Sequence, residues 1–178
     1  MLSDVDVERC GQVAAALGQW ATQRIGRQRP TPEQTSTKAH AADWVTTVDV
    51  AVEEHVRAEL GRHFPDHAII GEELGGDEPA DGRPRWYLDP IDGTTNFVHG
   101  LPRYSFSLAV ADEAGIAVGV VADPSSGEIL QAGRDRGATL DGKRVRCSPA
   151  TTLVGGIVCV ELAGYRCWPG LTDLLGQL

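Results

Sequence analysis

The sequence predicts an α+β fold in which N-terminal helices pack on a largely antiparallel sheet. Apolar residues in the first third of the chain recur with helical spacing, whereas beyond Phe97 apolar and polar residues alternate, as they do in strands. Short turn sequences separate the alternating stretches, which indicates an antiparallel meander. The chain has 178 residues, of which 42% are hydrophobic, and this length favours one compact domain over residues 1–178.

Two helices are expected in the N-terminal part. The first runs from Val5 to about Arg24 as an amphipathic helix that covers the sheet. The second begins near Thr46 or Thr47, because Thr46-x-x-Asp49 loosely fits a capping box, and it carries an apolar face of Val48, Val52, Val56 and Leu60. The segment 26–42 between them contains two prolines and no apolar period, which predicts a surface loop that carries Lys38.

The predicted strands begin after the second helix. A short buried strand, His67 to Ile70, leads into Gly71-Glu72-Glu73, and a second strand, Trp86 to Leu88, leads into Asp89, so both strands end in acids. A hydrophilic loop, Leu74 to Arg85, separates the two strands. Later strands are predicted at Tyr104 to Ala111, Ile116 to Ala122, Glu128 to Ala132 and Leu153 to Val160, with a hairpin signal at Asp141-Gly142.

Composition excludes several classes of partner. The formal net charge is -9 and the pI is near 4.9, which argues against binding to nucleic acid or to an anionic membrane. The N-terminal segment is too charged for a signal peptide or a membrane span. The four cysteines show no C-x-x-C pair and no zinc spacing. These features predict a cytoplasmic protein with reduced thiols.

The run from Trp86 to Phe97 carries the chemistry. Asp89 and Asp92 offer the hard oxygen ligands that magnesium prefers, and Gly93, Thr94 and Thr95 can offer backbone N–H groups to an anion if a helical turn begins there. Taken alone, Asp-Pro-x-Asp-Gly is also a good turn sequence. Glu72-Glu73, taken alone, also fits a solvated loop pair.

Hydrolysis of a phosphate monoester requires a nucleophilic water and a stabilised leaving oxygen, and two magnesium ions can supply both. Glu72, Asp89 and Asp92, with the carbonyl of Ile91, form a suitable oxygen set. Thr94 can orient the attacking water while Asp49 accepts a proton. Asp49 alternatively serves simply as a helix-start acid.

Several segments resemble the inositol monophosphatase family in order and spacing. They are Lys38, residues 43–49, Gly71-Glu72-Glu73 and the run 89–100, Asp-Pro-Ile-Asp-Gly-Thr-Thr-Asn-Phe-Val-His-Gly. The resemblance implies a layered α/β sugar-phosphatase fold and lithium-sensitive chemistry that depends on two or three Mg²⁺ ions. It assigns one ion to Glu72, Asp89 and the Ile91 carbonyl, and a second to Asp89 and Asp92. It assigns catalysis to Asp49, Thr94 and Glu72, a place near the metals to Lys38, and substrate or phosphate contacts to Glu72, Ile91, Asp92, Gly93 and Thr94.

The implied reaction is the hydrolysis of inositol-1-phosphate to inositol and phosphate by a metal-activated water, in a protein that forms homodimers. Fructose-1,6-bisphosphatase and other sugar-phosphate or histidinol-phosphate phosphatases are alternatives. The family's later Trp-Asp motif is absent, since Trp168 is followed by Pro169. We therefore expect the chain to lack the family's C-terminal part, which leaves the second α/β half incomplete. A catalytically defective metal-binding or dimerising remnant is the alternative of another class.

Overall fold

The computed structural model describes residues 1–38, 43–76, 81–157, 159 and 169–177. Its contacts divide the chain into two compact units, Met1–Arg146 and Cys147–Leu178, and each is described by itself. The prediction of a single domain over residues 1–178 stays a prediction. None of the helices in the described part of the chain has the length and apolar content that crossing a bilayer demands.

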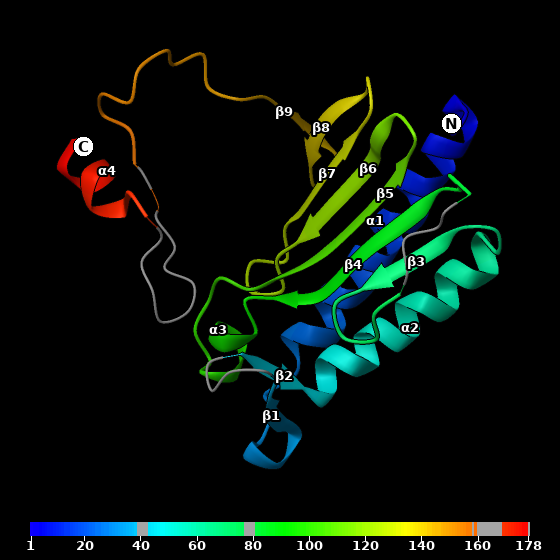
Figure 1. Ribbon diagram of the computed structural model, residues 1–178, viewed down its shortest axis with the longest axis horizontal. Coiled ribbons are helices and arrows are strands. Elements are labelled where there is room, and N and C mark those ends of the chain that lie inside the picture. The colour runs from blue at the N-terminus through cyan, green and yellow to red at the C-terminus, as the bar shows by residue number, and fades with distance from the viewer. Residues whose placement is uncertain (39–42, 77–80, 158, 160–168, 178) are drawn as a thin grey trace. The chain divides into compact units, whose positions relative to one another are not determined.

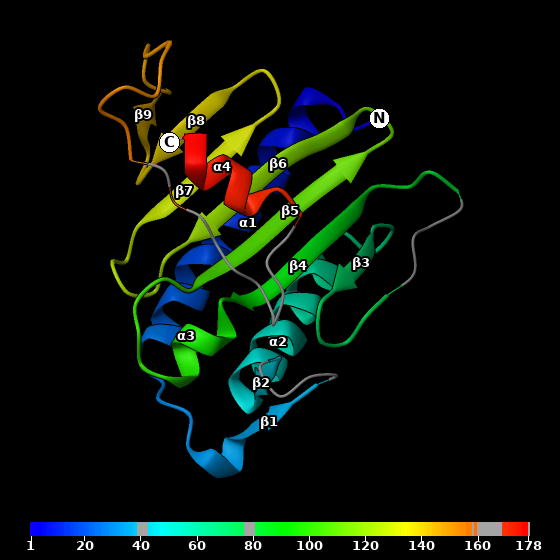
Figure 2. The ribbon, with the colours of Figure 1, turned by 60° about the vertical axis from the view of Figure 1, so that its left-hand side comes forward.

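A seven-stranded sheet forms the centre of the first unit, with its strands in chain order (Figure 1 and Figure 2). The β3–β4 pair is parallel and every later pair is antiparallel, which confirms the predicted meander. The strands are β3 Ala68–Gly71, β4 Arg85–Asp92, β5 Ser105–Asp112, β6 Gly115–Ala122, β7 Ile129–Gly133, β8 Gly137–Leu140 and β9 Lys143–Val145. The hairpin signal at Asp141-Gly142 is confirmed, because these two residues join β8 to β9 with positive φ angles of 49° and 75°.

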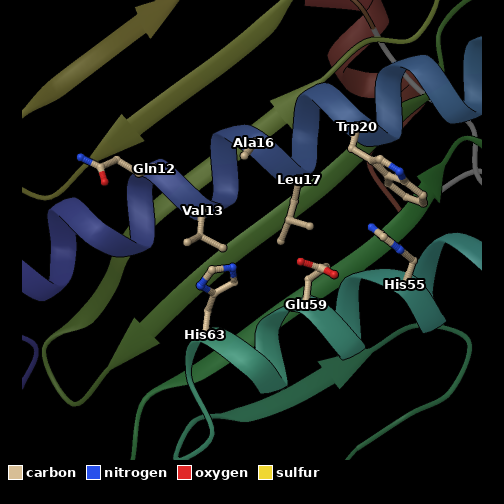
Figure 3. A pocket seen from close by; sticks show the side chains of 8 residues that line it. All are labelled: Gln12, Val13, Ala16, Leu17, Trp20, His55, Glu59 and His63. Atoms are coloured by element: carbon tan, nitrogen blue, oxygen red, sulfur yellow. The ribbon is translucent and has the colours of Figure 1, made fainter.

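Helices α1 (Asp4–Gly26) and α2 (Thr47–His63) lie side by side over the strands, as Figure 3 shows. Both begin with capping boxes, at Ser3 and Thr46, so the predicted start of α2 is confirmed. Alternate residues of β4 and β5 are buried, including Trp86 and Phe106, and the apolar faces of the helices are buried as well. This burial stabilises the packing of α1 and α2 on the sheet, and it fixes the position of the ends of β3 and β4.

The segment 26–42 differs from the prediction of an unstructured loop. Its described part contains a 3-10 helix, Pro32–Gln34, and strand β1, Thr35–Thr37, which pairs antiparallel with β2, Trp44–Thr46. The Lys38 amide donates to the Asp43 carbonyl at 2.7 Å and extends this ladder. Strand β1 was not predicted, because a three-residue polar strand shows no alternation of apolar and polar residues. Backbone pairing with β2, and not apolar burial, stabilises this strand.

In the second unit, the predicted strand from Leu153 to Val160 is wrong over its described residues. Residues 153–156 form a turn in which the Gly156 amide donates to the Leu153 carbonyl at 2.9 Å. Gly155 has a φ of 77°, a left-handed conformation that interrupts an extended strand. Positions 158 and 160 lie outside the described residues. Helix α4, Leu171–Gln177, was not predicted.

A buried carboxylate ties the N-terminus to the far end of the sheet. Asp112, 2% exposed at the end of β5, accepts hydrogen bonds from the amides of Leu2 and Ala114, both at 2.8 Å. The Arg134 guanidinium donates to both its oxygens, at 3.1 and 2.8 Å. Arg134 first, and then these amides, hold the pKa of Asp112 well below its usual range.

Asp112→Asn is therefore expected to lower the free energy of unfolding at pH 7 by about 2–3 kcal/mol, because it breaks a buried charge-assisted network. A depressed folded-state pKa gives stability that is complete above the unfolded pKa of about 3.9 and is lost as the pH falls through the folded value. Urea unfolding should show the difference between wild type and variant at pH 7 and a smaller one at pH 3. Asp66→Asn, at an exposed acid, is the control. Equal urea midpoints for wild type and Asp112→Asn at pH 7 would contradict this account.

Candidate functional site

The candidate site lies at the carboxyl ends of β3 and β4. Because these two strands are parallel, their carboxyl ends meet at one edge, with Gly71 paired to Leu88. The Glu72 amide donates to the Leu88 carbonyl at 3.0 Å, which sets Glu72 next to Asp89. A hollow of about 350 Å³ opens here, lined by Ile70, Gly71, Glu72, Tyr87, Leu88, Asp89, Ser107 and Ala109.

A bulge in β4 brings two predicted ligands onto one face of the sheet. Asp89 pairs with Ser107 and Asp92 pairs with Ser105, so three steps along β4 match two along β5. In a regular strand, residues three apart point to opposite faces; the extra residue places Asp89 and Asp92 on the same face. Pro90 fits this bulge because it has no amide hydrogen to give to a ladder. These acids thus belong to a strand longer than the predicted Trp86–Leu88, and residues 89–92 do not form a turn.

Asp89 has the electrostatic environment of a cation ligand. Its Oδ1 is buried and has no hydrogen-bond partner among the described residues. Burial, and then the carboxylates of Glu72 and Asp92, raise the pKa of Asp89 to about 8. The described side chains do not form a ready-made cage of three or more acidic, His or Cys ligands. An unpartnered buried oxygen between two other carboxylates nevertheless fits a hard cation such as magnesium.

Lys38 extends from the end of β1 into this acidic site. Its Nζ donates to Glu72 Oε1 and to Glu73 Oε1, each at 2.7 Å. Partial burial lowers the pKa of Lys38, but the hydrogen bonds to these two glutamates outweigh that effect and raise it overall. Glu73 was not predicted as a site residue, but its side chain is only 6% exposed and shares Lys38 with Glu72.

Helix α3, Thr94–Val98, begins at the end of β4, as the expected helical turn requires. Gly93 caps it with a left-handed φ of 90°, and a Cβ at this position would lie 2.9 Å from the Arg103 carbonyl oxygen. Only glycine combines this conformation with that close approach. Gly93 and Thr94 therefore stand at a helix start directly beside Asp92.

The two carboxylate oxygens of Asp49 make different contacts. Oδ2 accepts from the Thr46 amide at 2.9 Å and from the Thr46 hydroxyl at 2.5 Å, which completes the helix cap. Oδ1 lies 3.3 Å from Thr94 Oγ1, and that hydroxyl also lies 2.8 Å from the Ile91 carbonyl. Burial raises the pKa of Asp49, and the Thr46 hydrogen bonds oppose that shift. The helix-cap and catalytic interpretations of Asp49 are thus compatible in one side chain.

Sequence reasoning missed a third glutamate near the site. Glu53 is fully buried on α2 and binds the backbone that follows Glu72. The sequence contains a sign of this role, because Glu53 is a charged residue beside Val52, on the apolar side of the helix and four positions after Asp49.

A separate cavity of about 420 Å³ lies between α1 and α2 (Figure 3). Trp20 stacks on His55 there, with ring centroids 3.8 Å apart. The residues that line it are Gln12, Val13, Ala16, Leu17, Trp20, His55, Glu59 and His63, none of which belongs to the predicted site.

The fold and site together define an α+β protein with an acidic, helix-flanked site at the ends of two parallel strands. The chain belongs to the Inositol monophosphatase family, whose family model matches residues 2–166. It is 40% identical over 133 residues to the Nus factor SuhB of Pasteurella multocida, covering 75% of this chain and 49% of that protein. It is 36% identical over 162 residues to human Inositol monophosphatase 2, covering 89% and 56%.

Solved structures agree with the fold. The extragenic suppressor protein suhB of Bartonella henselae matches with a TM-score of 0.75 and 30% identity, over 82% of this chain and 57% of that one. A structure described as IMPase/NADP phosphatase complexed with Mg²⁺ and phosphate matches with a TM-score of 0.71 and 26% identity, over 81% and 55%. The predicted family and fold class are confirmed. The chain spans about half the length of the curated relatives it matches.

Proposed function

We propose that this protein hydrolyses a small phosphate monoester in a magnesium-dependent reaction, with inositol-1-phosphate as the substrate. The observation that carries the proposal is the meeting, at one sheet edge, of Asp89, whose buried Oδ1 has no partner in the described part of the chain, and the Thr94–Asp49 hydrogen bond. Membership of the Inositol monophosphatase family supports it.

The proposed ligand set is the one that the resemblance to the family implies, and the pairing of β3 with β4 supports it by placing Glu72 beside Asp89. Glu72, Asp89 and the Ile91 carbonyl would hold one ion, and Asp89 and Asp92 a second, with two or three ions in all. Bound magnesium would lower the pKa of a water and neutralise charge on the phosphate. Glu72, which is hydrogen-bonded to Lys38, would exchange that ammonium partner for the cation.

The remaining groups would orient the water and the substrate. Thr94 would take a proton from the attacking water as its own hydroxyl proton passes to Asp49, which is too deeply buried to meet the water directly. Gly93, without a side chain, would let the phosphate approach the start of α3. No covalent phosphoenzyme is needed in this scheme.

The names of the relatives support more than one substrate within the family. Proteins at similar identity are named either inositol monophosphatase or Nus factor, and a solved relative is described as an IMPase/NADP phosphatase. Fructose-1,6-bisphosphate, other sugar phosphates and histidinol phosphate are therefore the alternative substrates. A metal-binding or dimerising role without useful turnover is the alternative of another class. A homodimer and a cytoplasmic location remain part of the proposal.

The test is phosphate release by the purified chain from inositol-1-phosphate, fructose-1,6-bisphosphate and histidinol phosphate, each with magnesium and with a chelator. Chelator-sensitive release that is fastest with inositol-1-phosphate is expected. Calorimetric magnesium binding without release from any substrate would reject the enzyme and support the binding role. Release that persists in the chelator would reject the proposed metal dependence.

A further inference from the structure

Glu53 anchors the turn that follows β3. Its Oε2 accepts from the Glu73 amide at 2.8 Å, and its Oε1 accepts from the Leu74 amide at 3.1 Å. The carboxylate is fully buried, although it belongs to neither the proposed ligand set nor the Thr94–Asp49 pair. It therefore binds the backbone immediately after Glu72 from inside the protein.

Arg57 completes this anchor from the next turn of α2. Its Nε donates to Glu53 Oε1 at 2.8 Å, and its terminal nitrogens donate to the carbonyls of Ile69, at 3.4 Å, and Gly75. The arginine thus binds the carboxylate of Glu53 and the backbone on both sides of the turn. The Arg57 side chain and the two backbone amides together compensate the Glu53 carboxylate for the hydration that it loses on burial.

Gly71 makes the close approach possible. A Cβ on Gly71 would lie 1.9 Å from Glu53 Oε1, so any side chain there would displace the carboxylate. The Gly71 amide also donates to the Gly75 carbonyl at 2.9 Å, which closes the turn around Glu72 and Glu73. The glycine, the glutamate and the arginine form one arrangement with the turn at its centre.

We propose that Glu53 and Arg57 are positioning residues that set the direction in which Glu72 enters the metal site. This inference rests on the proposed function, because Glu72 is a ligand only in that proposal. The backbone of Glu72 is held on one side by Leu88, and the next two amides are held by Glu53. Without the hydrogen bonds to Glu53, the turn would be free to move and the Glu72 side chain would adopt several orientations. Magnesium would therefore bind more weakly.

The test compares Glu53→Gln with Asp112→Asn. Asp112 is a matched control because it is also buried, also accepts from two backbone amides and one arginine, and lies at the other end of the strands. Glutamine keeps the size of Glu53, but its NH₂ group faces an amide donor. Amide hydrogen exchange at Glu73 and Leu74 and calorimetric titration with magnesium are measured for the full chain.

Glu53→Gln is expected to speed exchange at Glu73 and Leu74 and to weaken magnesium affinity, each by about tenfold, the lower end of the effect of such outer partners. Asp112→Asn should lower the melting temperature and leave magnesium affinity within about twofold. Arg57→Lys keeps the charge but loses the guanidinium contacts to the carbonyls of Ile69 and Gly75, so exchange and magnesium affinity should change in the same direction by a smaller factor. This variant provides the test if Glu53→Gln does not fold.

Wild-type exchange and wild-type magnesium affinity in a folded Glu53→Gln or Arg57→Lys variant would overturn the inference. So would an equal loss of magnesium affinity in Asp112→Asn, since the effect would then be one of stability alone. If the wild-type chain binds no magnesium, the proposed function fails; exchange at Glu73 and Leu74 then decides separately whether Glu53 anchors the turn.

Discussion

Asp89→Asn is expected to weaken magnesium binding strongly and, at the same time, to stabilise the metal-free protein. Asp89 is half-buried beside Glu72 and Asp92, so without a cation its charge is opposed by both burial and like-charge repulsion. Removing that charge should raise the melting temperature by roughly 2–4 °C, the shift that about 1 kcal/mol produces in a protein of this size. Magnesium affinity should fall by about 100-fold or more, because a charged ligand proposed for both ions is lost.

Thermal unfolding with and without magnesium measures both effects in one experiment. Wild type should melt at a higher temperature when magnesium is added, as ligand linkage requires, and Asp89→Asn should show no such rise. Asp66→Asn removes an exposed carboxylate at the other end of β3 and should behave as wild type. A normal magnesium-induced rise in Asp89→Asn would remove Asp89 from the ligand set, and a lower metal-free melting temperature would contradict the proposed repulsion.

Thr94→Val is expected to reduce phosphate release by about 10² to 10³-fold while magnesium affinity stays within about threefold. The substitution keeps the shape of the side chain but removes the hydroxyl that lies between Asp49 and the Ile91 carbonyl, and proton transfer by a positioned group is worth about 10² to 10⁴-fold. Thr94→Ser keeps the hydroxyl and should retain most of the rate. Steady-state kinetics with inositol-1-phosphate, paired with magnesium titration, provides the measurement.

The double variant Thr94→Val/Asp49→Asn tests whether the two residues act as a unit. If Asp49 works through Thr94, the double variant should be no slower than the slower single variant. Multiplicative losses would show that Asp49 acts separately, for instance through the Thr46 cap alone. A rate in Thr94→Val equal to that of Thr94→Ser would exclude the hydroxyl from the reaction.

Local patterns were sufficient for much of the fold. The four-residue apolar spacing from Val48 to Leu60 and the Thr46 capping box predicted α2, and the alternation after Phe97 predicted the meander, because both signals act between residues close in sequence. They failed where the apolar pattern of a segment does not match the structure that the segment adopts. Strand β1 is stabilised by pairing with β2, and the apolar residues 153–157 do not form a strand in the structure.

The same division applies to the site. The amino-acid sequence by itself determined the residue types of the run from Asp89 to Thr94 and their order. Few other residues could take the place of Gly93, which has a left-handed φ, or of Pro90, which has no amide hydrogen. Only the tertiary structure decided which groups meet. The bulge that turns Asp89 and Asp92 to one face, the parallel pairing that brings Glu72 beside Asp89, and the burial of Glu53 under Gly71 all depend on contacts between separate elements. Such contacts form through packing and hydrogen bonding in space, which spacing along one chain does not encode.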